Sequence, residues 1–317
     1  MKIAFAGTQN FSKDVLCGLL KALPNDVHLD FTLTQPPRKR GRGQSLRHSD
    51  VYNFSVSNGI RVFTLEKSSQ LSEDLEYCLE QIDYLIVVSF GLIFSTKLLS
   101  LPTNGCLNIH PSILPRWRGA APIQRAIEAG DKYTGVCLMK MNIELDSGPV
   151  WGKRILPIKP LDSTFSLSNS LARESVELLK AFFKSSRNLQ KVKFYDQENV
   201  GISYAKKITV SDTKLIWDKP IREITDKIRA FSPDPGVFTF LCNQRIKLCS
   251  AEILEKRITT EHPGTVIELP NGNNKILKIA CKDGVLGVHR LQRAGGKWSD
   301  AKIFFNGFRI KLGDLFS

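Results

Sequence analysis

Three side chains of this chain have the chemistry of an acyl-transfer site: the amide of Asn108, the imidazole of His110 and the carboxylate of Asp146. Asn108 and His110 stand two residues apart in the apolar run 106–110, and side chains two apart on a strand point to the same face. Pro111 ends that strand, because proline has no N–H to donate. A neutral hydrogen-bond donor, a titratable ring and a nearby anion are groups that suit acyl transfer.

The same three residues also have ordinary structural explanations. An Asn or a His at the end of a strand is often a turn residue, and an isolated Asp is usually a turn former. A metal site is not expected as a competing chemistry, because none of the five histidines forms H-E-x-x-H and no two cysteines have C-x-x-C spacing. The choice between catalysis and structure therefore depends on the surrounding elements.

Apolar, strand-like runs alternate with helical patterns through the first half of the chain. We expect strands at 2–6, 27–34, 61–65, 84–90, 107–110 and 134–141, and helices at 11–23, 50–58, 71–81, 121–129 and 163–185. This alternation predicts a doubly wound, mostly parallel α/β sheet of the Rossmann-like type, which we assign to residues 1–187. Sites in such folds lie at the carboxyl ends of strands, near a change in strand order, and His110 stands at such an end.

Beyond residue 186 the pattern changes. Residues 188–207 are polar and mostly aperiodic, which is typical of a linker. After a helix expected at 221–231, five short strand-like runs follow, at 237–241, 245–251, 264–269, 276–281 and 285–289. Turn signals such as Asn-Gly and Asp-Gly separate several of them. We therefore predict a second domain over residues 208–317, a small β-barrel of the OB-like type.

Size and composition are those of an ordinary globular chain. Its 317 residues, of which 42% are hydrophobic, are enough for two domains. No apolar run has the length of a membrane-spanning helix, and the N-terminus is typical of a first strand and turn rather than a secretion signal. Seven scattered cysteines, an odd number, favour reduced thiols over disulfides. We expect a cytoplasmic protein that stays out of the membrane and works as a monomer.

The net charge of +14 favours a polyanionic partner, which long-range attraction and counterion release would draw in. A solvated, solubilising surface is the simpler explanation. The segment 38–47 holds five basic residues and two glycines. Glycines give a backbone that can enter a groove, and arginine can pair with phosphates or guanine edges. We predict that this segment is a loop that binds a nucleic-acid substrate.

The segment 107–123, with the sequence LNIHPSILPRWRGAAPI, resembles the signature of the methionyl-tRNA formyltransferase family. The Asp-Ser-Gly turn at 146–148 follows at the distance usual in that family. Further similar segments extend over nearly the whole chain, at 5–8, 34–36, 41–43, 88–93, 204–208, 229–231, 263–265 and 291–292. The R-W-R-G-A-A-P run is highly specific, whereas the trio alone marks only the wider group of folate-dependent formyltransferases.

The resemblance implies transfer of the formyl group of 10-formyltetrahydrofolate to the α-amine of methionine esterified to initiator tRNA, for the initiation of translation. Asn108 would donate a hydrogen bond to the formyl oxygen as negative charge develops there. His110 would stabilise the same charge or protonate the departing folate nitrogen. Asp146 would orient His110 and help to relay the proton of the amine.

The resemblance also implies residues that bind the two substrates, and it implies no metal. The folate pocket would be lined by Ser112, Ile113, Leu114 and Pro115, with backbone groups of Phe90, Gly91 and Leu92 meeting the pterin. The residues implied in tRNA binding are Arg38, Lys39, Arg40, Arg42 and Lys206. Arg42 and its neighbours would enter the acceptor stem, and the second domain would add phosphate contacts.

Two other functions stay open at this point. Another folate-dependent formyltransferase, acting on an amino-sugar nucleotide or a purine precursor, would share the trio but would not need the basic segment or a basic second domain. A non-catalytic nucleic-acid-binding protein would need only the basic segment and the barrel. It would tolerate replacement of Asn108, His110 and Asp146.

Overall fold

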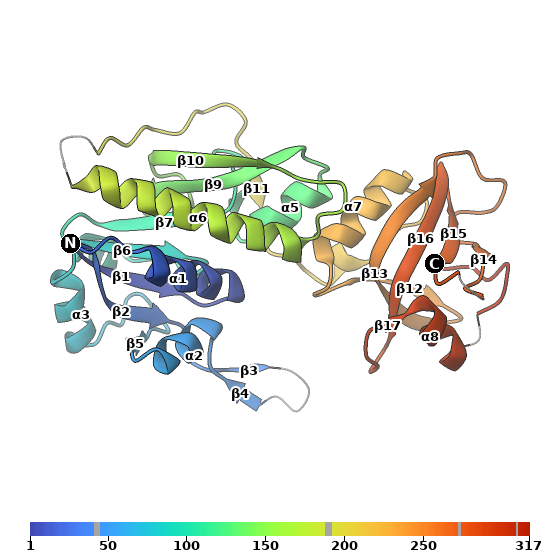
Figure 1. Ribbon diagram of the computed structural model, residues 1–317, viewed down its shortest axis with the longest axis horizontal. Coiled ribbons are helices and arrows are strands. Elements are labelled where there is room, and N and C mark those ends of the chain that lie inside the picture. The colour runs from blue at the N-terminus through green and yellow to red at the C-terminus, as the bar shows by residue number, and fades with distance from the viewer. Residues whose placement is uncertain (41–44, 188–191, 272–273, 309) are drawn as a thin grey trace. The chain divides into compact units, whose positions relative to one another are not determined.

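The computed structural model describes residues 1–40, 45–187, 192–271, 274–308 and 310–317 (Figure 1). Arg42, one of the predicted tRNA-binding residues, lies outside these ranges. The chain divides into two compact units. Unit 1 contains residues 1–122, 133–156 and 168–206, and unit 2 contains residues 123–132, 157–167 and 207–317. The domain boundaries expected from the sequence, at 187 and 208, stay a prediction.

Unit 1 contains a seven-stranded sheet in the order β10-β9-β7-β6-β1-β2-β5 (Figure 1). Its strands are β1 (Lys2–Gly7), β2 (His28–Thr34), β5 (Arg61–Thr64), β6 (Tyr84–Val88), β7 (Cys106–His110), β9 (Tyr133–Lys140) and β10 (Val150–Pro157). The pairs β1–β2, β1–β6, β6–β7 and β2–β5 are parallel, and β9 is antiparallel to β7. The prediction of a mostly parallel α/β sheet is therefore confirmed. The strand order reverses between β1 and β6, and β7, which carries Asn108 and His110, is the other neighbour of β6.

Helices cover both faces of this sheet. They are α1 (Asn10–Ala22), α2 (Asp50–Ser57), α3 (Glu73–Glu80), α4 (Thr96–Ser100) and α6 (Thr164–Ser186), most of which lies in unit 1. On one face, Ala4 and Leu85 belong to a buried cluster that also contains apolar residues of α3 and α4. On the other face, the ring of Phe182 in α6 meets Tyr84 of β6 edge-on, with the ring centroids 5.3 Å apart.

The helix α4 and the strand β10 of unit 1 were among the elements not expected from the sequence. The helix α4 has only five residues, and it begins after Ser95, whose side chain accepts a hydrogen bond from the backbone N–H of Leu98 at 3.3 Å. The strand β10 is half-buried or exposed along its whole length. It is one of the two edge strands of this sheet, and its sequence lacks the apolar alternation that predicts a strand with one buried face.

The basic segment 38–47 was expected to be a loop, and for its described residues this was wrong. Residues Arg38–Arg40 form β3 and residues Ser45–Arg47 form β4, which pair with each other in antiparallel register. Arg38 and Lys39 are exposed. Because water solvates their charges, backbone pairing can form despite a composition that is poor in typical strand residues.

The end of the polar connector also forms a strand. The backbone of Tyr204–Ala205, β11, pairs in parallel with Arg118–Gly119, β8. The carbonyl of Ala205 accepts hydrogen bonds from the N–H groups of Ala120 and Ala121, at 2.9 and 3.2 Å. The connector therefore contributes backbone contacts to the segment that follows His110.

Unit 2 contains an antiparallel sheet in the order β12-β13-β16-β15-β14, with β17 paired to β16. Its strands are β12 (Val237–Leu241), β13 (Gln244–Glu255), β14 (Val266–Glu268), β15 (Leu277–Cys281), β16 (Gly284–Arg293) and β17 (Ser299–Asp300), and its helices are α5 (Pro122–Glu128, from Ile123 on), η2 (Ser211–Thr213), α7 (Ile221–Phe231) and α8 (Ala301–Gly307). The five expected strands are all present, in an antiparallel sheet. That the sheet is an OB-like barrel stays a prediction.

Candidate active site

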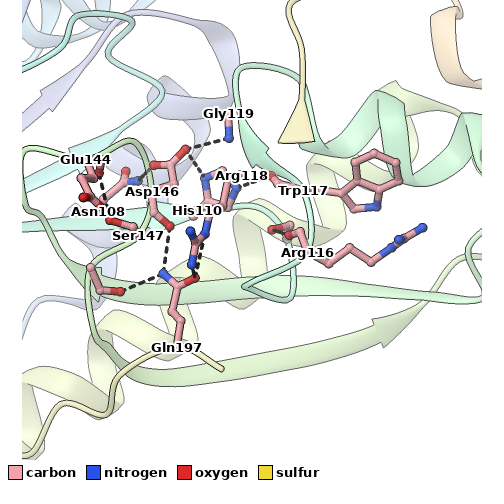
Figure 2. Close-up of polar contacts among 12 residues, drawn as sticks. Asn108, His110, Arg116, Trp117, Arg118, Gly119, Glu144, Asp146, Ser147 and Gln197 are labelled. Atoms are coloured by element: carbon pink, nitrogen blue, oxygen red, sulfur yellow. Dashed lines mark hydrogen bonds and ion pairs between the residues drawn. The ribbon is translucent and has the colours of Figure 1, made fainter. Parts of the chain in front are cut away.

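The trio predicted from the sequence converges at the carboxyl end of β7. Nδ2 of Asn108 donates to Oδ1 of Asp146 at 3.2 Å, and Nδ1 of His110 lies 3.6 Å from Oδ2 of the same carboxylate. Figure 2 shows the carboxylate of Asp146 between the other two side chains. The two-residue spacing on β7 places the amide and the ring on one face, and the turn after β9 brings the anion to them.

The hydrogen bonds of His110 fix its tautomer. Its Nε2 lies 2.8 Å from the carbonyl oxygen of Trp117, and because a carbonyl only accepts, Nε2 must carry a hydrogen. Nδ1, which faces Asp146, then has no hydrogen in the neutral ring and carries one only in the imidazolium. The side chain of His110 is only 5% exposed, against 14% for that of Asp146. Access to the trio from solvent is therefore greater at Asp146 than at the ring.

The backbone around Asp146 needs glycine at two positions. The N–H of Gly119 donates to Oδ2 of Asp146 at 2.8 Å. A Cβ on Gly119, where φ is +119°, would lie 2.9 Å from the carbonyl oxygen of Ala205. A Cβ on Gly148 would lie 1.8 Å from the carbonyl oxygen of Lys140. At both positions the neighbouring carbonyl oxygen leaves no room for a side chain. These glycines therefore let the backbone pack closely around the carboxylate of Asp146.

Two residues that hold the site together were missed by sequence reasoning, and both come from the polar connector. The amide of Gln197 contacts Arg118 and the backbone of the Asp146 turn. The hydroxyl of Ser203 accepts from the backbone N–H of Trp117 at 3.0 Å. A polar, aperiodic segment gives no sign of such contacts, because they depend on tertiary packing.

The four residues predicted to line the folate pocket differ in exposure. Ser112 is fully buried, and its hydroxyl donates to the carbonyl of Arg116 at 2.6 Å. Leu114 is buried in a small apolar cluster with residues of β9. Ile113 and Pro115 are half-buried. Surface for a ligand is therefore offered by Ile113 and Pro115 rather than by the other two.

The three residues predicted to face the pterin also differ in exposure and in the backbone groups they leave free. The carbonyl of Phe90 already accepts from Oγ1 of Thr8 at 2.8 Å and from Nε2 of Gln35 at 2.7 Å. The Phe90 ring is buried, whereas Gly91 is exposed with φ at +83° and Leu92 is half-buried. Since a carbonyl oxygen has two lone pairs, the backbone groups left for a ligand in this segment are those of Gly91 and Leu92.

Among the residues predicted to bind tRNA, Arg38, Lys39 and Lys206 are exposed. Arg40 is the last residue of β3. Lys206 directly follows β11.

Arg116 belongs to the specific R-W-R-G-A-A-P run. Its guanidinium lies 4.4 Å from the ring centre of Trp117, which is a cation–π contact. Figure 2 shows both side chains pointing away from the trio.

The thiols nearest to the trio in the sheet are not nucleophiles. Burial raises the pKa of Cys106, two residues before Asn108, to about 12. Burial likewise raises the pKa of Cys137, the partner of His110 in the β7–β9 register, to about 11.

In the described part of the chain, no group of three or more His, Cys, Asp or Glu could hold a metal ion. The described helices include none with the length and apolarity needed to cross a membrane.

Two known protein families match this chain. Residues 1–182 match the family described as Formyl transferase, and residues 207–309 match Formyl transferase, C-terminal domain. Together these matches define the class of the protein as a formyl transferase.

Full-length relatives indicate which family of formyl transferases this chain belongs to. A methionyl-tRNA formyltransferase of Dechloromonas aromatica is 37% identical over 100% of this chain and 99% of its own length. One of Neisseria meningitidis serogroup A is 34% identical over 99% of each. The chain therefore belongs to the methionyl-tRNA formyltransferase family.

Solved structures share the fold. HypX from Aquifex aeolicus, in complex with tetrahydrofolic acid, aligns with a TM-score of 0.65 at 17% identity, covering 98% of this chain and 48% of HypX. This chain thus spans about half the length of HypX. An N-formyltransferase from Helicobacter canadensis, in complex with folinic acid and dTDP-3-aminofucose, aligns with a TM-score of 0.64 at 20% identity, covering 93% of this chain and 100% of that one. At these identities the likeness concerns the fold alone.

Proposed function

We propose that this chain transfers the formyl group of 10-formyltetrahydrofolate to the α-amine of methionine on initiator tRNA. The observation that carries the proposal is the convergence of Asn108, His110 and Asp146 at the end of β7. The relatives that this chain matches over its full length, and that carry a name for their activity, are methionyl-tRNA formyltransferases. The amine is the nucleophile, so the protein needs to stabilise an oxyanion and to move protons rather than to supply a nucleophile of its own.

Asn108 is the proposed hydrogen-bond donor to the formyl oxygen. A primary amide has two N–H groups, and one of them is directed at Asp146. The second can meet the oxygen as negative charge develops on it. The bond to Asp146 holds the amide in place before substrate arrives, and preorganised donors of this kind contribute strongly to catalysis.

Asp146 and His110 are the proposed proton relay. Asp146 is the more exposed of the two, so it receives the proton of the attacking amine, directly or through water. Nδ1 of His110 lies 3.6 Å from the same carboxylate and can take the proton on from it, because the hydrogen on Nε2 is donated to the carbonyl of Trp117. Direct contact of His110 with the formyl group would require Nε2 to exchange that carbonyl for substrate.

Folate is the proposed formyl donor, and surface near the trio suits its chemistry. The loop that leads to Asp146 exposes Ile143 and Leu145, which are 67% and 56% exposed. Apolar surface of this kind can be covered by the aromatic parts of a folate. The exposed backbone at Gly91 and the partly exposed Leu92 can supply the polar groups that a pterin pairs with.

The basic hairpin β3–β4 is the proposed binding element for the acceptor end of the tRNA. Arg38 and Lys39 are exposed on β3, and Arg42 lies between the two strands in sequence. Lys206 directly follows β11, the strand that pairs with Arg118–Gly119, and the N–H of Gly119 donates to Asp146. Phosphate contacts at these positions would give binding that weakens as salt rises.

Unit 2 offers a further proposed contact for phosphate. A pocket of about 450 Å³ is lined by Ile208, Thr209, Val210, Thr213, Pro235, Arg245 and Lys247. The guanidinium of Arg245 lies 3.8 Å from the ring centre of Phe238, and its Nε is buried without a hydrogen-bond partner among the described residues. A buried donor beside a pocket fits an anionic ligand.

We also propose that the protein acts in the cytoplasm, as a monomer. Support for the location comes from its seven unpaired cysteines and from the translational role of the proposed reaction. Sedimentation of the purified protein would test the proposed monomer.

The proposed function is tested by incubating the purified chain with 10-formyltetrahydrofolate and methionyl initiator tRNA, then measuring formyl-methionine. We expect formylation of that tRNA and none of methionyl elongator tRNA. A parallel reaction with a dTDP-amino sugar tests the alternative acceptor. Formylation of the sugar in place of the tRNA would contradict the proposal, and so would binding of tRNA without formylation.

A further inference from the structure

Gln197 joins two chain segments that hold Asp146, although it lies in the polar connector, far from the trio in sequence. Its Nε2 donates to the carbonyl oxygens of Asp146 and Gly148, each at 2.8 Å. Its Oε1 accepts from Nε and Nη2 of Arg118, at 3.1 and 2.8 Å (Figure 2). A glutamine amide has two donor hydrogens and two acceptor lone pairs, so the amide is fully used.

These partners fix the direction of the amide. Carbonyl oxygens only accept and a guanidinium only donates, so a reversed amide would place oxygen against oxygen and N–H against N–H. The backbone nearby is held as well, because Tyr195 exchanges two hydrogen bonds with Val150, at 2.8 and 2.9 Å. Gln197 itself is half-buried. The contact is therefore part of the packing of unit 1.

Asp146 is a residue whose backbone needs such support. Its φ is +49°, in the left-handed region that residues other than glycine disfavour. The hydrogen bond from Gln197 to the carbonyl of Asp146 fixes the peptide plane between Asp146 and Ser147. On the other side, Arg118 directly precedes Gly119, whose N–H donates to Oδ2 of Asp146. One amide thus links the backbone that carries the carboxylate to the segment that supplies its hydrogen-bond donor.

We infer that Gln197 is a positioning residue for formyl transfer: it sets the direction of the Asp146 carboxylate without touching substrate. This inference rests on the proposed function. Gln197 lies between the two segments that match the family, residues 1–182 and 207–309. The connector therefore supports the active site as well as joining two parts of the chain.

The substitution Gln197→Glu separates this role from simple anchoring of Arg118. Glutamate keeps the side-chain length and an acceptor for Arg118, but it loses both donors and places a negative oxygen against the carbonyls of Asp146 and Gly148. Gln197→Leu removes both sets of contacts. We expect both variants to lower kcat for formylation, by up to about 100-fold, with an unchanged KM for methionyl-tRNA. Glu198→Gln, at the exposed neighbouring position, is the matched control and should keep the wild-type kcat.

A double-mutant cycle with Asp146→Asn completes the test. If Gln197 acts through Asp146, Gln197→Leu lowers kcat in the wild-type background and has no further effect in the Asp146→Asn background. Wild-type kcat in Gln197→Glu, or equal fold-losses from Gln197→Leu in both backgrounds, would overturn the inference. A wild-type protein that does not formylate methionyl-tRNA would instead refute the proposed function, so the two failures are distinguishable.

Discussion

The side-chain amide of Asn108 donates a hydrogen bond to Oδ1 of Asp146 at 3.2 Å, across 38 residues of sequence. The other oxygen of that carboxylate accepts from the backbone N–H of Gly119 at 2.8 Å and lies 3.6 Å from Nδ1 of His110. Asp146 is thus the common partner of Asn108, His110 and the backbone of Gly119.

Asp146→Asn should lower kcat for formylation by about 10²–10⁴-fold, the range typical of a lost acid–base group. An asparagine has one oxygen, so Asn108 and Gly119 would compete for it, and His110 would lose its anion. The KM for methionyl-tRNA should not change. Glu144→Gln, an exposed position in the same loop, is the control. Steady-state kinetics at saturating folate measures both quantities, and an Asp146→Asn enzyme with wild-type kcat would refute the relay.

Gly119→Ala should destabilise the fold and abolish formylation. The added Cβ would lie 2.9 Å from the carbonyl oxygen of Ala205 at a φ of +119°, and such backbone strain costs about 1–3 kcal/mol. Gly201→Ala is the matched control, because its φ is +80° but nothing lies within 4 Å of the added atom. Urea unfolding compares the two free energies of unfolding. A smaller loss in Gly119→Ala than in Gly201→Ala would show that contact with Ala205 does not matter.

Arg42→Ala and Lys39→Ala should each weaken tRNA binding and make it less sensitive to salt. Each lost phosphate contact lowers the slope of log Kd against log salt by about 0.7–0.9. Lys21→Ala, an exposed lysine at the end of α1, should leave the slope unchanged. Titrations of labelled tRNA at several salt concentrations give the slopes. Equal slopes in all variants would exclude the hairpin from the tRNA site.

The buried thiols predict both reactivity and a pH dependence of stability. Burial raises the pKa of Cys106 to about 12 and that of Cys137 to about 11, from an ordinary value of 9.0. Because these folded pKa values are raised, the contribution of the two thiols to the free energy of unfolding is complete below about pH 9 and is lost as pH rises toward 11–12.

With iodoacetamide at pH 8, the exposed Cys242 should react first and Cys106 only after unfolding. Mass spectrometry of native and urea-treated protein measures this. Equal labelling rates for Cys106 and Cys242 in the native protein would contradict it.

Much of the fold could be predicted from periodicity. The helix Ile221–Phe231 begins and ends where its apolar spacing places it, because one face is buried along its whole length. The strand Val150–Pro157 could not be predicted, since an edge strand with mostly exposed side chains has no apolar alternation. The charged strands of the basic hairpin were missed for a related reason: backbone pairing, rather than side-chain burial, holds them.

The candidate site was predictable only in part. Asn108 and His110 could be placed together because a two-residue spacing on a strand is a local property. Asp146 could be added because it follows the next apolar strand and matches the family's turn. Gln197 could not be found, because its contacts with Arg118 and Asp146 span 79 and 51 residues and leave no local pattern.

The most direct test of the account is the single-turnover rate of formyl transfer to bound methionyl-tRNA in His110→Ala and Asn108→Ala, measured beside the Kd for tRNA. We expect each substitution to lower that rate by at least about 100-fold and to leave the Kd at the wild-type value. Wild-type transfer rates in both variants would show that the convergence on Asp146 is structural and not catalytic.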